Sequence, residues 1–245
     1  MTCVSPTFLH FFQSPPIRAA LADVDVEALQ GLKITQRHYP PHSVVFHQGD
    51  IEHRMLIVNS GWSCVYRDLP TGDRQIIDFP LKGDILGLRT AQGQIYNSFA
   101  SITDLSVFEI TLSELNPVVS RSPLLSQIFM GLLARQRSIL VEHLTNLGRR
   151  SASVRIAHLF LELAVRLENG GLTTAAGFSC PLTQYELADA LGLTAIHINR
   201  MLRELRERGL VAFKNGEVEF LNRTGLTRLA NFDPGYLSLK APSAI

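Results

Sequence analysis

Short apolar runs separated by turn residues dominate the first half of the chain, from about Thr35 to Ile110. The runs are SVVFHQ, RMLIVNSG, WSCVYRD, RQIIDFP and LSVFEI, and the turns between them contain QGD, NSG, PTGD and KGD. Several short strands at this spacing predict an antiparallel sandwich or barrel. Within LPTGDRQ we expect a hairpin turn in which Gly72 takes a positive φ.

Helical spacing of apolar residues flanks the strand region on both sides. IRAALADVDVEALQGL predicts a helix that ends near Gly31, and TLSELNPVVSRSPLL opens a long helical region. From residue 124 to 147 the apolar positions form one stripe: Leu125, Ile128, Leu132, Ile139, Val141, Leu144 and Leu147. Such a stripe favours a helix that pairs with a copy of itself; a helix packed along its own domain is the alternative. GRRSASVRIAHLFLELAVRL predicts a further amphipathic helix.

Two short helical patterns meet at Gly192 within residues 182–202, LTQYELADALGLTAIHINRML. Thr183 followed by Glu186 is a capping box, which starts the first helix. Gly192 permits a sharp turn, and Thr194 can cap the second helix. This arrangement predicts a helix-turn-helix, whose second helix enters the major groove of DNA while the first crosses the phosphates.

The second helix of the pair has two distinct faces when its residues are placed about 100° apart. One face is apolar and must be core: Ile198, Met201, Leu202 and Leu205. The opposite face carries Ile196, Asn199, Arg200 and Arg203, with His197 and Glu204 on one flank. In the major groove Arg can bond a guanine edge, Asn an adenine edge, and an apolar side chain can touch a thymine methyl. We therefore expect base contacts from Ile196, Asn199, Arg200 and Arg203.

Donor groups around this helix suit phosphate oxygens. Two alternating runs flank Asn215-Gly216, a strong hairpin signal that predicts the wing of a winged-helix domain with Lys214 at its tip. We expect phosphate contacts from Thr183, Gln184, Thr194, His197 and Lys214. Any solvated helix carries such charges, although a β-branched apolar residue, Ile196, at the centre of the polar face is unusual for one. The ordered set of capping box, glycine turn, capped second helix and Asn-Gly hairpin is more specific than any of its members, and it favours double-stranded DNA as the partner.

The order of these elements resembles the Crp/Fnr superfamily of bacterial transcription regulators. The similarity is strongest in GRRSASVRIAHLFLEL and LTQYELADALGLTAIHINRMLRELRERGLV, and looser in GDIEHRMLIVNSG and KGDILG. It implies an α+β fold with an antiparallel β-roll sensor domain (a double-stranded β-helix or jelly roll), a dimerisation helix, a winged helix-turn-helix and a C-terminal tail, in residues 17–120, 121–148, 149–223 and 224–245. It further implies a cytoplasmic homodimer on a palindromic promoter site, with RNA polymerase as a further partner.

Two departures from the family pattern concern recognition. Ile196 stands where family members carry a glutamate four residues before the arginine that matches Arg200, so the half-site preference should differ. Cyclic-nucleotide binders of the family hold the phosphate with Gly-Glu and Arg-Ser pairs, whereas this chain has Gly87-Leu88 and Asn97-Ser98. We therefore expect a small-molecule effector other than cyclic AMP, or none, and no cofactor.

Composition and charge narrow the remaining classes. With 245 residues, 46% hydrophobic and 18% charged, the chain has an ordinary globular composition. Residues 1–148 hold 11 Lys+Arg and 13 Asp+Glu, a net of −2, and the rest hold 12 and 9, a net of +3. The C-terminal part is thus the better partner for a polyanion. No run approaches the roughly 20 apolar residues of a membrane span.

The cysteines and histidines do not indicate a metal, cluster or redox site. Cys3, Cys64 and Cys180 are too few for a four-thiolate cluster and form no disulfide framework, which favours a reducing compartment. We expect Cys64 to be a buried apolar residue and not a redox sensor. Histidines 38, 42, 47 and 53, with Glu52, raise the alternative of a cupin-like metal-dependent enzyme with an accessory helical domain. They do not keep one strand parity, so we expect no metal site and no enzyme.

Overall fold

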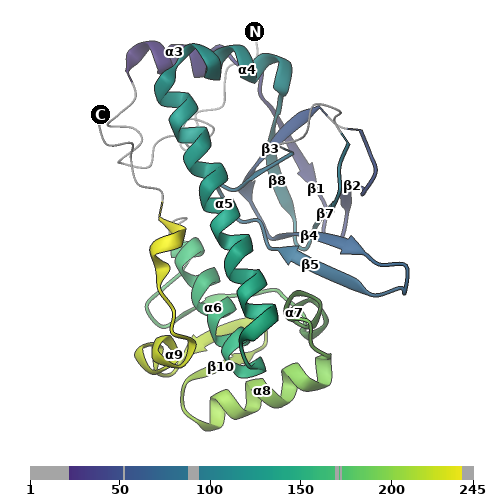
Figure 1. The fold of residues 1–245 in the computed structure, drawn as a ribbon, viewed down its shortest axis with the longest axis vertical. Helices are drawn as coiled ribbons and strands as arrows, with labels where there is room; N and C mark the ends of the chain where they lie inside the picture. The colour runs from purple at the N-terminus through teal and green to yellow at the C-terminus, as the bar shows by residue number, and fades with distance from the viewer. Residues whose placement is uncertain (1–21, 52, 88–93, 169–170, 172, 239–245) are drawn as a thin grey trace.

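Two antiparallel β-sheets pack face to face in the N-terminal half of the computed structural model, which describes residues 22–51, 53–87, 94–168, 171 and 173–238 (Figure 1). One sheet has the order β1-β8-β3-β6, formed by Thr35–Tyr39, Leu105–Thr111, Arg54–Ser60 and Ile85–Leu86. The other has the order β2-β7-β4-β5, formed by Val44–Phe46, Ser98–Ser101, Ser63–Asp68 and Arg74–Asp78. The expected antiparallel β-roll is confirmed.

The hairpin that joins β4 and β5 has the expected turn. Gly72 has a φ of 88°, and its N–H donates to the Leu69 carbonyl at 2.9 Å. The Leu69 N–H in turn donates to the Asp73 carbonyl at 2.9 Å. Because glycine has no Cβ, it takes this left-handed conformation without strain, and β4 and β5 can pair closely.

Strand β3 is apolar on both faces because both faces are covered. Leu56 and Val58 point between the two sheets, where Phe46 and Phe99 lie with ring centroids 5.3 Å apart. Met55 and its neighbours on that face point the other way, toward three helices. These are α3, α4 and the start of α5, which span Asp23–Gln30, Leu112–Arg121 and Pro123–Arg149. The continuous apolar run of β3 in the sequence reflects this double burial.

Helix α5 is 27 residues long and runs through most of the length of the molecule (Figure 1). It begins where Pro123 follows Ser122, whose hydroxyl oxygen accepts from the Leu125 N–H at 3.1 Å. Proline suits the first turn of a helix because its missing N–H would have no helical partner there. The break at Ser122 separates α4 from α5, so the long helical region expected from the sequence consists of two helices.

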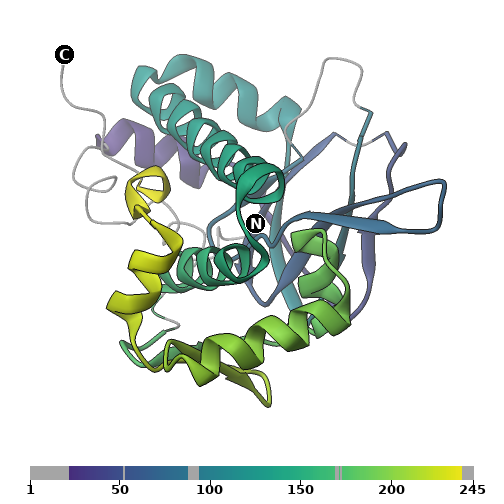
Figure 2. The same cartoon turned by 60° about the horizontal axis from the view of Figure 1, so that its bottom comes forward.

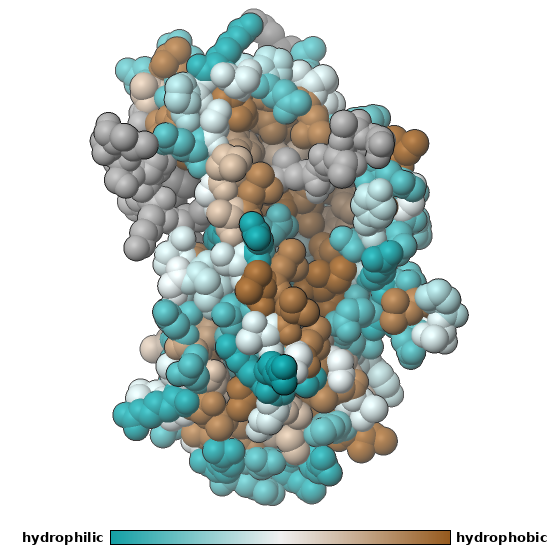
Figure 3. All heavy atoms as spheres, in the orientation of Figure 1, coloured by the Kyte–Doolittle hydropathy of each residue, from teal (hydrophilic) through white to brown (hydrophobic). Residues whose placement is uncertain are grey.

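The apolar stripe expected on this helix is divided between two surfaces. Four of its members pack inside their own chain: Leu125, Ile128, Leu132 and Ile139. The exposed apolar side chains of α5 form a second line, in which Val141 and Leu144 come from the expected stripe: Met130, Leu133, Leu140, Val141 and Leu144. Figure 3 shows apolar side chains gathered over α5 down the middle of this face. The expectation of one pairing stripe was wrong for the buried four, since apolar spacing alone does not distinguish a neighbour in the chain from one outside it.

The C-terminal half is built from helices around a small sheet of order β10-β11-β9. Its helices α6, α7 and α8 span Ala152–Glu168, Gln184–Leu191 and Ala195–Glu207. Its strands β9, β10 and β11 span Gly177–Ser179, Val211–Lys214 and Glu217–Phe220. The segment called a tail from the sequence contains helix α9, Arg223–Ala230, and a 3₁₀ turn η1, Pro234–Leu237. Both bury apolar residues, Leu226 and Leu237 among them, so the described part of this segment, up to residue 238, contributes to the core.

One apolar core continues across the expected boundary between the sensor and the DNA-binding part. Phe79 and Leu81, which follow β5, belong to the same buried cluster as Phe160 of α6 and Leu187 of α7. Helix α7 lies against β5 (Figure 1). Arg74 of β5 forms an ion pair with Asp189 of α7. The helix-turn-helix therefore packs directly against the β-roll.

Candidate nucleic-acid interface

Side-chain caps define both helices of the helix-turn-helix. The Glu186 carboxylate accepts from the Thr183 N–H at 2.6 Å, and the Thr183 hydroxyl oxygen accepts from the Glu186 N–H at 3.2 Å. Helix α7 ends at Gly192, whose φ is 62°. The Thr194 hydroxyl oxygen then accepts from the His197 N–H at 3.2 Å and starts α8. The capping box, the glycine turn and the second cap are all confirmed.

The faces of α8 are as the sequence predicts. Ile198, Leu202 and Leu205 are buried, and Met201 is half-buried. Ile196 is 83% exposed on the other side. Figure 2 shows α8 along the outer surface of the molecule. A large apolar side chain fully open to water is unfavourable in isolation, and such exposure is common where a surface meets a partner.

The outward polar residues of α8 make side-chain contacts within the helix-turn-helix. The Asn199 side-chain amide donates to Oε1 of Gln184 on α7. Nη2 of Arg200 lies 3.3 Å from Nε2 of His197, one turn earlier on the same face. Arg203 has a weaker partner, with its Nε 4.0 Å from a carboxylate oxygen of Glu207. These contacts fix the direction in which Asn199 and Arg200 present their remaining donors and acceptors.

The wing follows directly after α8. Strands β10 and β11 pair with each other, and the turn that joins them is Asn215-Gly216, whose φ values are 54° and 74°. Two positive φ values in succession are what a two-residue hairpin of this twist requires, so the expected hairpin is confirmed. Lys214 is exposed beside the turn, directly opposite Glu217 on the paired strand.

The structure thus brings two pairs of the expected contact residues together, and adds one residue that the sequence reading missed. Gln184 meets Asn199, and His197 meets Arg200. Tyr185, in the first turn of α7, is 74% exposed, and its ring lies on the same capped turn as Gln184. Tyr185 is the second residue of α7. Helical spacing could have indicated that it is exposed, because the side chains that α7 buries begin only at Leu187.

Comparison with known proteins identifies both halves. A model of the Crp-like helix-turn-helix domain matches residues 154–229, and a model of the cyclic nucleotide-binding domain matches residues 36–122. The nitrogen fixation regulation protein FixK of Bradyrhizobium diazoefficiens is 29% identical over 227 residues, which cover 90% of this chain and 94% of the relative. The chain belongs to the Crp/Fnr superfamily of transcription regulators.

Further Crp/Fnr relatives agree. Electron transport regulator A of Shewanella oneidensis is 29% identical over 187 residues, covering 76% of this chain and 74% of the relative. The structure of FixK2 from Bradyrhizobium japonicum superposes with a TM-score of 0.74 at 26% identity, covering 81% of this chain and 98% of that one. These relatives are regulators, so this Crp/Fnr protein is a transcription regulator and not the cupin-like enzyme considered from the sequence. No described helix combines the length and hydropathy needed to cross a membrane.

The positions that hold a cyclic nucleotide elsewhere in the Crp/Fnr superfamily are only partly described. Gly87 has a φ of 84°, while Leu88 lies outside the described residues. Ser98 is buried in β7, and its hydroxyl oxygen already accepts from the Gln48 N–H at 3.0 Å. Asn97, half-buried beside it, offers an amide in place of the cationic guanidinium expected of a phosphate site.

The described histidines and cysteines singled out from the sequence lie outside the one described group that has metal-ligand spacing. Histidines 38, 42, 47 and 53 are exposed, and Glu52 and Cys3 lie outside the described residues. Burial raises the pKa of the Cys64 thiol to about 12, so it stays protonated as a small buried side chain. Burial likewise raises the pKa of Cys180 to about 12. Among the described residues, one group has metal-ligand spacing, Asp78, His143 and Glu162, and it lies at the junction between the two halves.

Proposed function

We propose that this regulator binds a palindromic DNA site as a homodimer and reads each half-site with α8. The observation that carries the proposal is the exposure of Ile196, at 83%, beside the outward Asn199 and Arg200 on a helix whose other face is core. A helix of this width fits the major groove. The regulator would act in the cytoplasm, where its promoter sites are found.

Base reading is proposed for Ile196, Asn199, Arg200 and Arg203. Arg200 can donate two hydrogen bonds to a guanine, and the Ile196 side chain can contact a thymine methyl. With Ile196 in place of an acidic residue, the carboxylate that would accept from a cytosine amino group is missing. The preferred half-site should therefore contain a thymine where relatives with a glutamate select the base pair carrying that cytosine.

Phosphate contacts are proposed for Thr183, Gln184, Thr194, His197 and Lys214. Both threonines use their hydroxyl oxygens as helix caps, which leaves each hydroxyl hydrogen free to donate. Gln184 uses Oε1 to hold Asn199, which leaves its amide N–H groups free for a phosphate. The same bond uses one N–H of the Asn199 amide, which leaves its Oδ1 and its second N–H for a bidentate contact with adenine.

Homodimerisation is proposed through the exposed line on α5. Met130 is 66% exposed and Leu144 is 71% exposed, and the members of this line lie on one face of the helix, at steps of three, four or seven residues with Leu140 and Val141 adjacent. Apolar residues at that spacing pack well against a second helix of the same kind. Two-fold symmetry then places the two copies of α8 about one turn of DNA, ~34 Å, apart.

The β-roll is proposed to respond to a small-molecule effector other than cyclic AMP. The support is the chemistry of the expected phosphate positions: Asn97 provides no positive charge, and leucine replaces the acidic residue after Gly87. A cyclic phosphate would then lack the charged partner that strengthens its hydrogen bonds. RNA polymerase is the further partner that a promoter-bound regulator would contact.

Selection of binding sites from random duplex DNA by the purified full-length protein tests the proposal. We expect a palindromic consensus, and affinity that falls steeply and linearly in log–log form as salt increases. Ile196→Glu should change one base pair of each half-site, and Arg200→Ala should cost about 1–3 kcal/mol and relax the preference at one other. Lys214→Ala should weaken binding to all sequences alike. A consensus that stays unchanged in both α8 variants would rule out α8 as the reading helix.

A further inference from the structure

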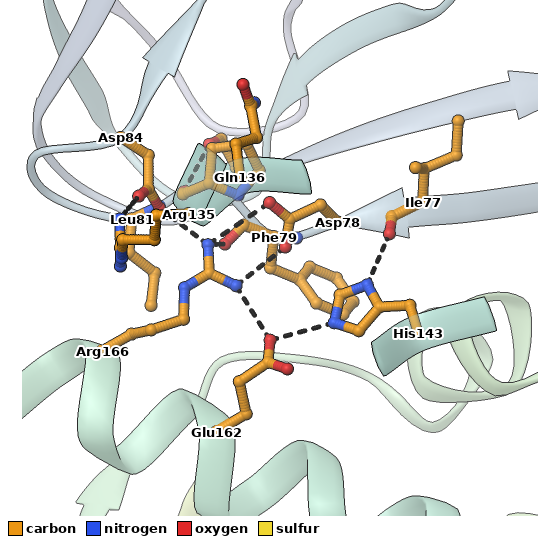
Figure 4. A network of polar contacts seen from close by, with 12 residues as sticks. Ile77, Asp78, Phe79, Leu81, Asp84, Arg135, Gln136, His143, Glu162 and Arg166 are labelled. Carbon is orange, nitrogen blue, oxygen red and sulfur yellow. Dashed lines mark hydrogen bonds and ion pairs between the residues drawn. The ribbon is translucent and has the colours of Figure 1, made fainter. Parts of the chain in front are cut away.

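Six charged side chains gather where the β-roll, α5 and α6 meet: Asp78, Asp84, Arg135, His143, Glu162 and Arg166 (Figure 4). We call this group the junction cluster. Asp78 ends β5, and Asp84 lies in the turn before β6. Arg135 and His143 come from α5, and Glu162 and Arg166 from α6. The cluster therefore joins the sensor, the long helix and the first helix of the DNA-binding part at one point.

Arg166 is the centre of the junction cluster and is 3% exposed. Its Nη1 donates to Asp78 Oδ1 at 2.8 Å and to Glu162 Oε1 at 3.1 Å. Its Nη2 donates to Asp84 Oδ2 at 2.7 Å and to the Phe79 carbonyl at 2.9 Å. One planar guanidinium thus contacts three separate groups of the β-roll, and its fork geometry permits only a narrow range of orientations of α6.

His143 ties α5 to the same point. Its Nδ1 lies 2.9 Å from the Ile77 carbonyl and its Nε2 lies 2.9 Å from Glu162 Oε1. Both partners are acceptors, so both ring nitrogens donate and the ring is a cation. Burial opposes that charge, but Glu162 outweighs it and raises the pKa of His143 to about 9. Tyr236 of η1 donates to the second oxygen of Glu162 at 2.8 Å, so both carboxylate oxygens of Glu162 accept hydrogen bonds.

Charge balance argues against a metal ion at this place. Arg135, His143 and Arg166 supply three positive charges, and Asp78, Asp84 and Glu162 supply three negative ones. Nη1 of Arg166 lies between the carboxylates of Asp78 and Glu162, where an ion would bind. A buried divalent cation would bring two further positive charges with no carboxylate to offset them. The charges of the junction cluster therefore balance without a metal ion.

A second set of contacts holds the helix-turn-helix to the same surface. Arg74 of β5 donates to Asp189 of α7 at 2.9 Å. Arg155 of α6 donates to the Leu191 carbonyl at the end of α7 at 2.9 Å, and to the Arg150 carbonyl at the end of α5 at 2.9 Å. Helix α6 starts two residues after that point, so these bonds bridge the connection between α5 and α6. The direction of α8 relative to α5 follows from the direction of α6.

We infer that Arg166 is a positioning residue for DNA recognition: through the junction cluster it fixes α6, and with it α8, at one distance and angle from α5. This inference rests on the proposed homodimer, because α5 of each subunit lies on the two-fold axis and α8 reads the half-site. The cluster then determines which separation of half-sites the dimer accepts. Directional buried ion pairs suit this role, since apolar contacts would allow α6 to slide.

The test varies the separation between the two half-sites of the best selected palindrome. One inserted base pair moves a half-site by about 3.4 Å and turns it by about 34°. We expect wild-type protein to lose about tenfold or more in affinity, a change that corresponds to about 1.4 kcal/mol. In Arg166→Met we expect a loss of about threefold or less for the same insertion, because a mobile α6 follows the displaced half-site. Arg121→Met, an exposed arginine of α4, is the matched control and should behave as wild type.

Two further measurements keep the outcome decisive. Affinity for a duplex with only one intact half-site should be the same in Arg166→Met and wild type, because α8 itself is unaltered. Asp84→Asn removes one carboxylate at the edge of the cluster, and it decides the question if Arg166→Met does not fold. A folded Asp84→Asn variant that keeps the full wild-type penalty for the insertion would overturn the inference. Wild-type protein that selects no palindrome would instead contradict the proposed function.

Discussion

The buried His143–Glu162 pair predicts a specific loss of stability above neutral pH. An ordinary histidine has a pKa of 6.5, and the folded value for His143 is about 9. Between these values the folded protein holds a proton that the unfolded chain has released. The free energy of unfolding must therefore fall as pH rises through this window, and the full contribution is present only below pH 6.5.

The magnitude follows from the same two values. At about 1.4 kcal/mol for each pH unit, the interval from 6.5 to about 9 corresponds to about 3 kcal/mol of stability. The pKa of Glu162 depends on the same contact with His143. Burial opposes its ionisation, but His143 and Arg166 outweigh burial and lower the pKa of Glu162 to about 2 from 4.5. The two shifts share one interaction, so adding them would count it twice.

Urea unfolding at fixed protein concentration between pH 6.5 and 9 measures this effect in wild type and in His143→Gln. Glutamine retains a donor for Glu162 but carries no titrating proton. We expect the difference in unfolding free energy between the two proteins to be largest near pH 6.5 and to shrink by about 3 kcal/mol toward pH 9. The thiols of Cys64 and Cys180 are the same in both proteins, so their ionisation in the unfolded chain cancels in the difference. Parallel curves for the two proteins over the whole range would refute the charged pair.

Two structural substitutions have matched controls. Leu144→Glu, at the C-terminal end of the exposed α5 line, should convert the proposed dimer to monomer in sedimentation, since two buried leucines contribute about 1.5–3 kcal/mol each. Arg149→Glu, an exposed position of the same helix about 140° away from Leu144, should not. Gly177→Ala would place a Cβ 1.9 Å from a backbone oxygen of β11 and should cost more than about 3 kcal/mol in thermal unfolding. Gly72→Ala meets open space and should cost only about 1–2 kcal/mol for its left-handed φ.

The helix-turn-helix was predictable because its signals are local. A threonine and a glutamate three residues apart determine where α7 begins, and both of their hydrogen bonds form. Gly192 and Asn215-Gly216 specify backbone conformations that few other residues take, so the turn and the wing are determined within a few positions. Helical periodicity then separates the buried face of α8 from the outward one without any knowledge of the rest of the fold.

The junction cluster could not be foreseen by the same means. Arg166 and Asp78 are 88 positions apart, and in the sequence Arg166 is one of the ordinary charged positions of an amphipathic helix. Periodicity states that a residue lies on a given face but not what covers that face. The same limit explains α5, where the buried and the exposed apolar lines lie on one helix. Which line packs inside depends on the β-roll, which contributes residues from distant strands.

The cost of burying the cluster indicates what it provides. Removing six charges from water requires several kcal/mol for each ion, and well-packed apolar residues of similar volume often give equal or greater stability. Stability alone therefore does not account for Arg166, whose Nε is buried without a hydrogen-bond partner among the described residues. What an apolar replacement would lack is direction: contacts at 2.7–3.1 Å from one guanidinium to Asp84, Asp78 and Glu162 define an orientation. The proposed homodimer, which has to place two reading helices at one fixed spacing, would gain from that constraint even without a gain in stability.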